Sequence, residues 1–321
     1  MSATPNRAQT GASRKAHSLR SLRAGAIWDV LPLRDRSLMQ WLVAGDIVTA
    51  QLASLLVYGQ LRTAQRRLQR LVELGLVHGF WTGSAQRPRG RYAYTLTRPT
   101  RLEIEALVWP HGRPERPPEL PGSPPIHQLA THDVLAAFVR ASDAAGPEGL
   151  FAWVPERPCG QLFGGFLRPD ALAGIRVERR AIALFVERDL GTERGEVLAE
   201  KVRRYRSVLS RTPDLAVHVG FVVASHRRAR TVYALDQSRG STAPEVLVVA
   251  ATADELEADP LGARWSDGRS SWPTRDLPPL ASWVDWPILA PGCLAEPDDL
   301  AAFDDRASIM LPALHRYFRQ V

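Results

Sequence analysis

The sequence predicts a two-part protein of mixed α and β structure. At 321 residues the chain is long enough for two domains that each bury a core. Apolar residues at helical spacing, followed by two short strand-like runs, occupy the part up to about residue 98. After a proline-rich stretch, apolar strand-like runs alternate with helical stretches, which is typical of an α/β domain with a mixed sheet. The expected fold class is therefore α/β, or α+β over the whole chain.

Composition divides the chain into five segments. These are a disordered basic tail over 1–26, a first domain over 27–98, a linker over 99–125, a second domain over 126–262 and an extension over 263–321. The tail lacks apolar periodicity, so no packed structure is expected there. The prolines of the linker have no backbone N–H, so they cannot donate the hydrogen bonds of a helix or a sheet. In the extension the sequence predicts only a last helix near 308–318, and it indicates no function.

Positive charge is concentrated in the first domain and the tail. Residues up to 98 hold 15 Arg and Lys against four Asp and Glu, a balance of +11, whereas the remainder holds 26 against 30, a balance of −4. The basic surface is therefore N-terminal, and nucleic acid is the leading partner. A solvated basic arm is the alternative.

Neither a membrane span nor a metal-binding cysteine motif is expected. The chain has no run of eighteen apolar residues, and its first residues lack the apolar core of a signal peptide, so we expect a cytoplasmic protein. Cys159 and Cys293 are isolated, without the spacing of metal ligands, and are expected to be packed in the interior.

The first domain shows the pattern of three helices and a hairpin. The helices are expected around Leu38–Leu42, over 47–57 behind Thr49 as N-cap, and over 61–74 before Gly75; the strands begin at Leu76 and Arg91. An Arg-Pro-Arg-Gly tip at 87–90 joins the strands. Three helices followed by a basic hairpin form a winged helix-turn-helix.

The third helix has an apolar face and a basic face. Arginine can bind phosphates or guanine edges, so the basic face resembles a recognition helix for the major groove of double-stranded DNA. The candidate DNA-binding residues are Arg62, Arg66, Arg67 and Arg70 on the helix and Arg87, Arg89 and Arg91 on the hairpin. A solvated helix face and a protein contact are the alternatives.

The second domain begins with an amphipathic helix from about His127. Strands are expected within 150–156, 166–175, 179–189, 216–224 and 245–252, and further helices over 194–210 and 226–238. Carboxylates lie in two of these segments. Asp170 follows Pro169, and Glu187 and Asp189 project to the same face because strand side chains alternate. Mg²⁺ or Mn²⁺ would relieve the repulsion among such carboxylates.

Lys201 lies within or beside the apolar stripe of the helix over 194–210. That stripe comprises Val197, Leu198, Val202, Tyr205 and Leu209. A charged amine there either extends to solvent or reaches the carboxylates. Beside a metal it would orient water or neutralise phosphate charge in the transition state. A buried ion-pair network without chemistry is the alternative.

The segments RPD, VERDLGTE and EKVRRY together resemble the core of the PD-(D/E)XK nuclease-like superfamily. More closely, the chain is similar to the actinobacterial replication-relaxation family, which combines a winged helix with such a domain. The resemblance implies a restriction-endonuclease-like mixed sheet, metal ligation by Asp170 and Glu187, and Lys201 as a catalytic lysine moved onto the helix. It adds His132 and Glu156 as secondary candidates. The chain departs from the superfamily at Asp189, where a lysine is usual.

Two functions follow from these patterns. The first is a DNA-binding protein of plasmid or mobile-element replication or relaxation, with replication or transfer proteins as partners, whose nuclease-like domain cleaves DNA with a divalent metal. The second is a non-catalytic winged-helix regulator that uses the same domain for homodimerisation or partner binding. Asp189 leaves this choice open, and a protein-interaction adaptor is the third alternative.

Overall fold

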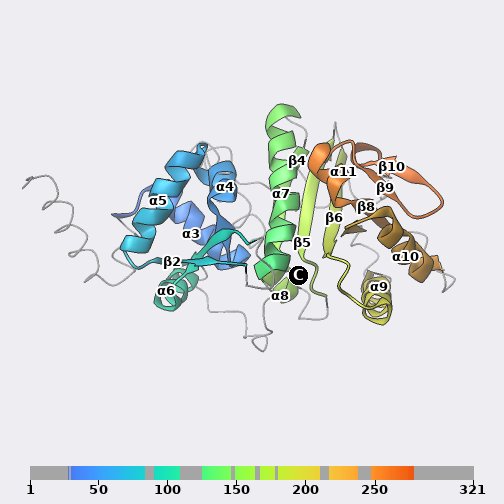
Figure 1. Cartoon of the computed structure of the whole chain (residues 1–321), viewed down its shortest axis with the longest axis horizontal. Helices are drawn as coiled ribbons and strands as arrows, with labels where there is room; N and C mark the ends of the chain where they lie inside the picture. Colours follow the sequence, from blue (N-terminus) through green and yellow to red (C-terminus); the bar gives the residue numbers. More distant parts are fainter. Residues whose placement is uncertain are drawn as a thin grey trace, which may run out of the picture. The chain divides into compact units, whose positions relative to one another are not determined.

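The computed structural model describes residues 28, 30–83, 90–108, 125–145, 149–162, 167–177, 180–209, 217–237 and 247–277. They belong to two compact units that divide after Arg116, and each unit is described by itself (Figure 1). Helices and a mixed sheet together give the α/β class that the sequence predicts. No helix among the described residues is long and apolar enough to cross a membrane.

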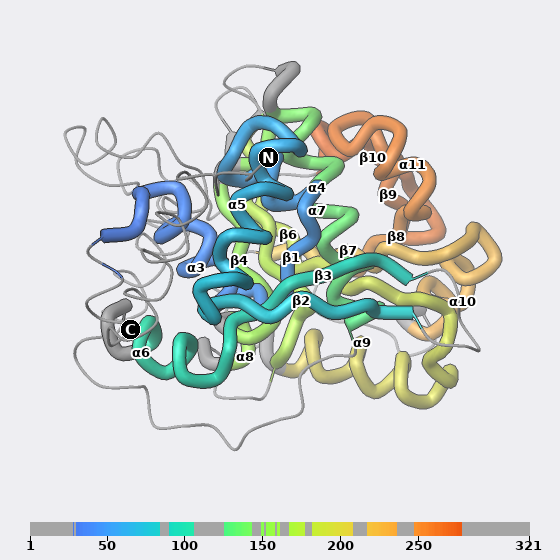
Figure 2. The backbone as a smooth tube through the Cα atoms, turned by 60° about the vertical axis from the view of Figure 1, so that its left-hand side comes forward, coloured from blue at the N-terminus to red at the C-terminus, as the bar shows by residue number. Residues whose placement is uncertain are grey.

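The N-terminal unit is built from helices and a small sheet. Its elements are α3 (Leu33–Gly45), β1 (Val48–Thr49), α4 (Ala50–Ala53), a π-helical turn η1 (Ser54–Tyr58), α5 (Leu61–Glu73), β2 (Val77–Trp81), β3 (Tyr92–Leu96) and α6 (Arg98–Val108). The strands are ordered β1-β3-β2 with antiparallel pairing, and β2 and β3 run side by side in Figure 2. Leu68 and Leu71 of α5 and Trp41 of α3 are buried in its core.

The second predicted helix is shorter than the sequence suggests. Thr49 is its N-cap, as predicted, and its hydroxyl accepts a hydrogen bond from Leu52 N at 3.1 Å. Ile47 and Val48 lie before that cap, and Val48 pairs with Tyr94 of β3 instead of joining the helix. After the single α-helical turn of α4, the chain continues as η1 and ends at Gly59 in the left-handed region, with φ of 75°. The expected helix over 47–57 is therefore wrong at its start, which lies at Ala50, and its second half is π-helical up to Tyr58.

The linker prediction also needs a correction at its start. Residues 98–108 form α6, because Pro99 lies in the first turn, where its missing N–H is tolerated, and no other proline interrupts the helix. The prolines are concentrated from Pro110 onwards. Residues 109–124 lie outside the described residues, as do the basic tail over 1–26, the hairpin tip over 84–89 and the helix expected near 308–318.

A buried acid ties α5 to α3. Asp35 is fully buried in the first turn of α3, and its Oδ1 accepts hydrogen bonds from the Tyr58 hydroxyl at 2.8 Å and from Arg67 Nε at 3.1 Å. The Arg67 guanidinium also forms an ion pair with Asp35 Oδ2. The hydrogen bond and charge of Asp35 outweigh desolvation and raise the pKa of Arg67. This carboxylate therefore fixes the position of α5 from its interior side.

The C-terminal unit is a seven-stranded mixed sheet with helices on both faces. Its elements are α7 (Pro125–Ala145), β4 (Gly149–Pro155), α8 (Glu156–Leu162), β5 (Ala171–Val177), β6 (Arg180–Asp189), α9 (Gly195–Leu209), β7 (His218–Val223), α10 (His226–Gln237), β8 (Val248–Thr252), α11 (Ala253–Ala258), β9 (Arg264–Ser266), β10 (Ser271–Pro273) and a 3₁₀ turn η2 (Thr274–Asp276). The strand order is β10-β9-β8-β7-β6-β5-β4. The central pairs β6–β7 and β7–β8 are parallel, and the others are antiparallel.

The two faces of the sheet are covered by different helices. Helices α7 and α11 pack together on one face, whereas α9 and α10 pack together on the other (Figure 1). Ala183 and Phe185 of β6 point into the core under α9, with Leu198 and Val202. Because strand side chains alternate, Glu187 continues the same row as Phe185. This row brings an acid into the end of an apolar core.

The sheet extends beyond the predicted end of the second domain at residue 262. Strands β9 and β10 add to its edge, and Trp265 of β9 is completely buried, with its indole N–H donating to Thr274 Oγ1 at 2.8 Å. The predicted boundary is wrong because β9 and β10 have three residues each, too few to show a strand period.

We expect Asp35→Ala to destabilise the N-terminal unit by about 2 kcal/mol, because it removes the charged partner of Tyr58 and Arg67. Hydrogen exchange of the α5 amides measures this opening free energy within the unit. Arg70→Ala, which removes an exposed pair with Glu73 at 3.0 Å, is the control and should cost about 0.5 kcal/mol or less. Equal effects of the two substitutions would contradict the structural role of Asp35.

Candidate functional site

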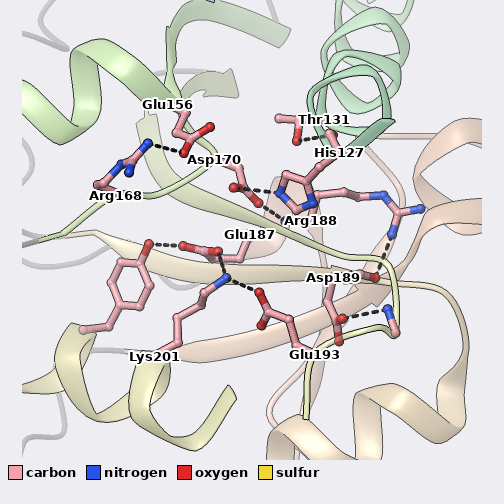
Figure 3. Close-up of polar contacts among 12 residues, drawn as sticks. His127, Thr131, Glu156, Arg168, Asp170, Glu187, Arg188, Asp189, Glu193 and Lys201 are labelled. Atoms are coloured by element: carbon pink, nitrogen blue, oxygen red, sulfur yellow. Dashed lines mark hydrogen bonds and ion pairs between the residues drawn. The ribbon is translucent and has the colours of Figure 1, made fainter. Parts of the chain in front are cut away.

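Asp170 and Glu187 meet at the end of the antiparallel pair β5–β6. Ala171 pairs with Val186, so Asp170 and Glu187 occupy the next opposed positions of the same register. Both side chains are buried, at 6% and 1% exposure. Figure 3 shows the two carboxylates beside each other, with α7 on one side and α9 on the other. The structure therefore brings together the two acids that the sequence singles out.

Glu187 is held by two residues of α9. Its Oε2 lies 2.8 Å from Lys201 Nζ, and its Oε1 accepts a hydrogen bond from the Tyr205 hydroxyl. Burial raises the pKa of Glu187, the charge of Lys201 lowers it and the charge of Asp170 raises it, which leaves the pKa at about 7. Near neutral pH this carboxyl group is therefore divided between its charged and neutral forms.

Lys201 reaches the carboxylates instead of extending away from them. Its Nζ contacts both Glu187 and Glu193 Oε1, the latter at 3.1 Å (Figure 3). Burial lowers the pKa of Lys201, but the negative charges of Glu187 and Asp170 outweigh that effect and raise it. The predicted apolar stripe is correct at Leu198, Val202 and Tyr205, which are buried.

The predicted stripe is wrong at Val197, which is 53% exposed although the next residue, Leu198, is completely buried, because the packed face of α9 is narrower than the predicted stripe. The side chain of Leu209 lies outside the described residues.

Asp170 has its own partners on the other side. Its Oδ1 lies 2.9 Å from His127 Nε2, and its Oδ2 accepts a hydrogen bond from the backbone N–H of Arg188 at 2.6 Å. Burial lowers the pKa of His127, but the hydrogen bond and charge of Asp170 outweigh it, so the pKa is raised. His127 therefore belongs to this group of contacts, although no sequence pattern singles it out.

His132, the histidine that the family resemblance indicates, lies on the same helix. His132 is buried on α7, five residues after His127 and roughly 140° further around the helix. Histidines on two faces of one predicted helix give no sign of which face meets the strands. Glu156, the other secondary candidate, begins α8 and accepts a hydrogen bond from Arg168 at 2.8 Å. Its charge also raises the pKa of His127, so Glu156 lies close to the site.

Asp189 has a different role from Glu187, although both point to the same face. Its Oδ1 accepts a hydrogen bond from Gly191 N at 2.7 Å, and its Oδ2 pairs with Arg228 of α10. Arg228 also donates to the backbone carbonyl of Glu193 at 2.8 Å. Asp189 and Arg228 therefore fix the loop between β6 and α9, and that loop presents Glu193 to Lys201. Sequence spacing gives no signal for Arg228, which lies 39 residues after Asp189.

The donor set around Asp170 and Glu187 offers two carboxylates to a divalent cation. In the part of the chain that the structure describes, no group of three or more His, Cys, Asp and Glu side chains is arranged to hold a metal. The carboxylates of Asp170 and Glu187 already contact His127, Arg188, Lys201 and Tyr205. A hard cation such as Mg²⁺ can bind through one or two carboxylates and retain water ligands. Asp170 and Glu187 can therefore bind such an ion only if the ion displaces some of these side-chain and backbone contacts.

The predicted DNA-binding arginines differ in their surroundings. Arg62 and Arg66 are exposed on α5, Arg70 pairs with Glu73, and Arg67 is engaged by Asp35 on the interior side. On the hairpin Arg91 is exposed, and its backbone exchanges hydrogen bonds with Thr82 at 2.9 and 3.0 Å. Arg87 and Arg89 lie outside the described residues.

We expect a carboxyl carbon resonance of Glu187 to titrate near pH 7 and to vanish in Glu187→Gln. Because folding raises this pKa, the contribution of Glu187 to stability is present below about pH 4.5 and is lost as the pH rises through about 7. Lys201→Met should raise the pKa of Glu187 further by removing the neighbouring charge. Glu200→Gln, on the outer side of α9, is the control and should leave the resonance unchanged. Titration of Glu187 near its ordinary value would contradict the buried pair.

Comparison with known proteins supplies a family for these features. Neither the curated proteins nor the solved structures that were compared contain a match to the chain. The family model described as replication-relaxation matches residues 41–223, more than half of the 321 residues. The matched region includes α5, the hairpin β2–β3 and the strands and helix that bring Asp170, Glu187 and Lys201 together. The chain therefore belongs to the replication-relaxation family.

Proposed function

We propose that the chain is a DNA-binding protein that acts in the replication or relaxation of a plasmid or another mobile element. The observation on which the proposal rests is the two-sided helix α5. Its inner face buries Ala64, Leu68 and Leu71, and its outer side exposes Arg62 and Arg66. We further propose that α3, α4, α5 and the hairpin β2–β3 act as a winged helix, with α5 in the major groove of double-stranded DNA.

The surroundings of the arginines support different roles for Arg67 and for Arg62 and Arg66 on α5. Asp35 neutralises Arg67 and anchors the helix, which leaves Arg62 and Arg66 to face solvent one turn apart. Arginines one turn apart can bind phosphates along one strand or fork onto guanine edges. The net balance of +11 over residues 1–98 adds long-range attraction to the polyanion.

We expect binding to a duplex of arbitrary sequence to weaken by about 10³ between 50 and 200 mM salt, as about six phosphate contacts require. Arg62→Ala combined with Arg66→Ala should reduce the slope of log affinity against log salt by about 1.8, because each lost contact removes about 0.9. Fluorescence anisotropy measures both quantities. Arg269→Ala, an exposed arginine of the C-terminal unit, is the matched control. A slope near zero, or equal slopes for the variant and the control, would contradict the proposal.

Metal-dependent DNA cleavage is a second candidate function, in which the C-terminal unit is a PD-(D/E)XK nuclease-like domain. One observation favours it: Asp170 and Glu187 lie opposite each other, and Lys201 reaches Glu187 from the next helix. Asp170 and Glu187 would hold Mg²⁺ or Mn²⁺, which would supply Lewis-acid stabilisation of a phosphodiester under attack. Lys201 lowers the pKa of Glu187 and so favours the charged carboxylate that such an ion needs.

The non-catalytic alternative is favoured by the contacts that already occupy both carboxylates. In that case the cluster is an ion-pair network that fixes α7 and α9 on the sheet, and the C-terminal unit serves homodimerisation or the binding of replication or transfer proteins. Supercoiled plasmid incubated with protein and Mg²⁺ or Mn²⁺ distinguishes the two.

For the cleavage candidate we expect nicked circles from the wild-type protein, and a loss of nicking rate of about 10² or more in both Asp170→Ala and Lys201→Ala. Glu200→Ala, which removes an exposed carboxylate next to Lys201 in the sequence, should leave nicking unchanged. Duplex binding is measured in parallel, and circular dichroism verifies that each variant is folded. Binding with intact supercoils in every case would contradict cleavage and support the non-catalytic alternative.

A further inference from the structure

The hairpin β2–β3 exposes two large aromatic side chains at its outer end. Trp81 and Tyr92 are directly opposed in the antiparallel register and are 56% and 53% exposed. The same face is buried at the base of the hairpin, where Val77 pairs with Leu96. The aromatic pair therefore lies where this face leaves the core of the N-terminal unit.

Both rings lie directly over glycines of the hairpin. A Cβ on Gly79 would lie 2.7 Å from the Tyr92 hydroxyl and 2.8 Å from Tyr92 Cε1, so the tyrosine ring covers Gly79. A Cβ on Gly90 would likewise lie 2.7 Å from Trp81 Cε2, so the indole covers Gly90. Because no side chain lifts the rings from the backbone, each has one side against the strands and the other towards solvent.

A third ring supports this arrangement from the base. Tyr94 is buried to 9% exposure and meets Tyr92 edge to face, with ring centroids 5.2 Å apart and planes at 76°. Edge-to-face contacts are a favourable geometry for aromatic pairs. The backbone beyond the pair is also fixed, because Thr82 N donates to the Arg91 carbonyl oxygen and Arg91 N donates to the Thr82 hydroxyl oxygen. The two exposed rings are thus parts of an ordered ribbon.

The charge around the aromatic pair identifies the class of ligand. Arg91 precedes Tyr92 and is exposed, and the sequence between the strands, from Ser84 to Arg91, contains three arginines and no acid. Flat apolar rings within a basic segment match a ligand that combines π-faces with negative charge. Unpaired nucleotides have this combination, whereas the faces of paired bases are covered by their neighbours in the duplex stack.

We propose that Trp81 and Tyr92 form a stacking surface for the bases of single-stranded DNA, beside the duplex-binding helix α5. The proposal rests on the DNA-binding function proposed above and extends it to a junction, with α5 on the duplex and the hairpin on an adjoining unpaired strand. Such a junction is the form of DNA that replication or relaxation of a duplex exposes. A protein partner for the aromatic pair is the competing explanation.

The test measures the affinity of the full chain for three probes: a blunt duplex, a duplex with a single-stranded oligo-dT arm, and oligo-dT alone. Trp81→Ala and Tyr92→Ala should each weaken binding to oligo-dT and to the armed duplex by roughly five- to hundredfold, as expected for the loss of one stacked base. Neither should change binding to the blunt duplex. Trp81→Phe should restore part of the loss, because it returns an aromatic face.

Leu102→Ala is the matched control, since Leu102 of α6 is a similarly exposed apolar side chain at 40%. A 2-aminopurine base within the oligo-dT should be quenched by the wild-type protein and by Leu102→Ala, but not by Trp81→Ala. Circular dichroism verifies that each variant is folded.

The outcomes separate this proposal from the proposed function. If Arg62→Ala with Arg66→Ala weakens duplex binding while Trp81→Ala and Tyr92→Ala leave all three probes unchanged, the stacking surface is overturned and the DNA-binding function remains. Equal weakening of the blunt duplex and of oligo-dT by Trp81→Ala also overturns the stacking surface. If the wild-type protein binds none of the probes, both proposals fail.

Discussion

The buried contact between Glu187 and Lys201 determines how the C-terminal unit is arranged. Glu187 continues a row of core side chains on β6, so its carboxylate is removed from water with 1% of the side chain exposed. A charge in that position is costly unless a partner and further hydrogen bonds compensate it. Lys201 and Tyr205, one turn apart on α9, supply both. The edge of α9 that carries Lys201 and Tyr205 must therefore lie over the end of β6. The loop before α9 must also bring Glu193 to Lys201.

The register of β5 and β6 brings a second carboxylate into the same site. Asp170 opposes Glu187 in the register of β5 and β6, and its charge raises the pKa of Glu187 while His127 and a backbone N–H hold Asp170 in place. Two acids and one lysine at the meeting point of α7, β5, β6 and α9 are suited either to a divalent cation or to a closed network. Asp189 does not join them. It pairs with Arg228 of α10 and accepts a hydrogen bond from Gly191 N, so Asp189 has structural partners of its own.

Arginine has two separate tasks in the N-terminal unit. Where a buried acid is within reach, as Asp35 is for Arg67, the guanidinium joins the packing between α3 and α5. Where no core residue opposes it, as at Arg62 and Arg66, it remains exposed on the helix. The hairpin adds aromatic rings to this basic surface, seated on glycines instead of being buried. Exposed arginines and exposed aromatic rings thus lie on different elements of one small unit.

The periodic features of the protein follow from the sequence alone. Apolar spacing placed α5, α9 and α10 and the strands β5 to β8 within a few residues, and the alternation of side chains along β6 placed Glu187 and Asp189 on one face. Local patterns failed where an element was too short to have a period, as in β9 and β10, or where a cap cut a helix short, as at Thr49. Three contacts depend on the tertiary structure alone. They are the contact of His127 with Asp170, the ion pair of Arg228 with Asp189, and the ion pair of Arg67 with Asp35. The two residues of each contact are between 32 and 43 positions apart in the sequence. The packing of whole helices and strands brings them within hydrogen-bonding distance, and spacing along the chain does not encode that packing.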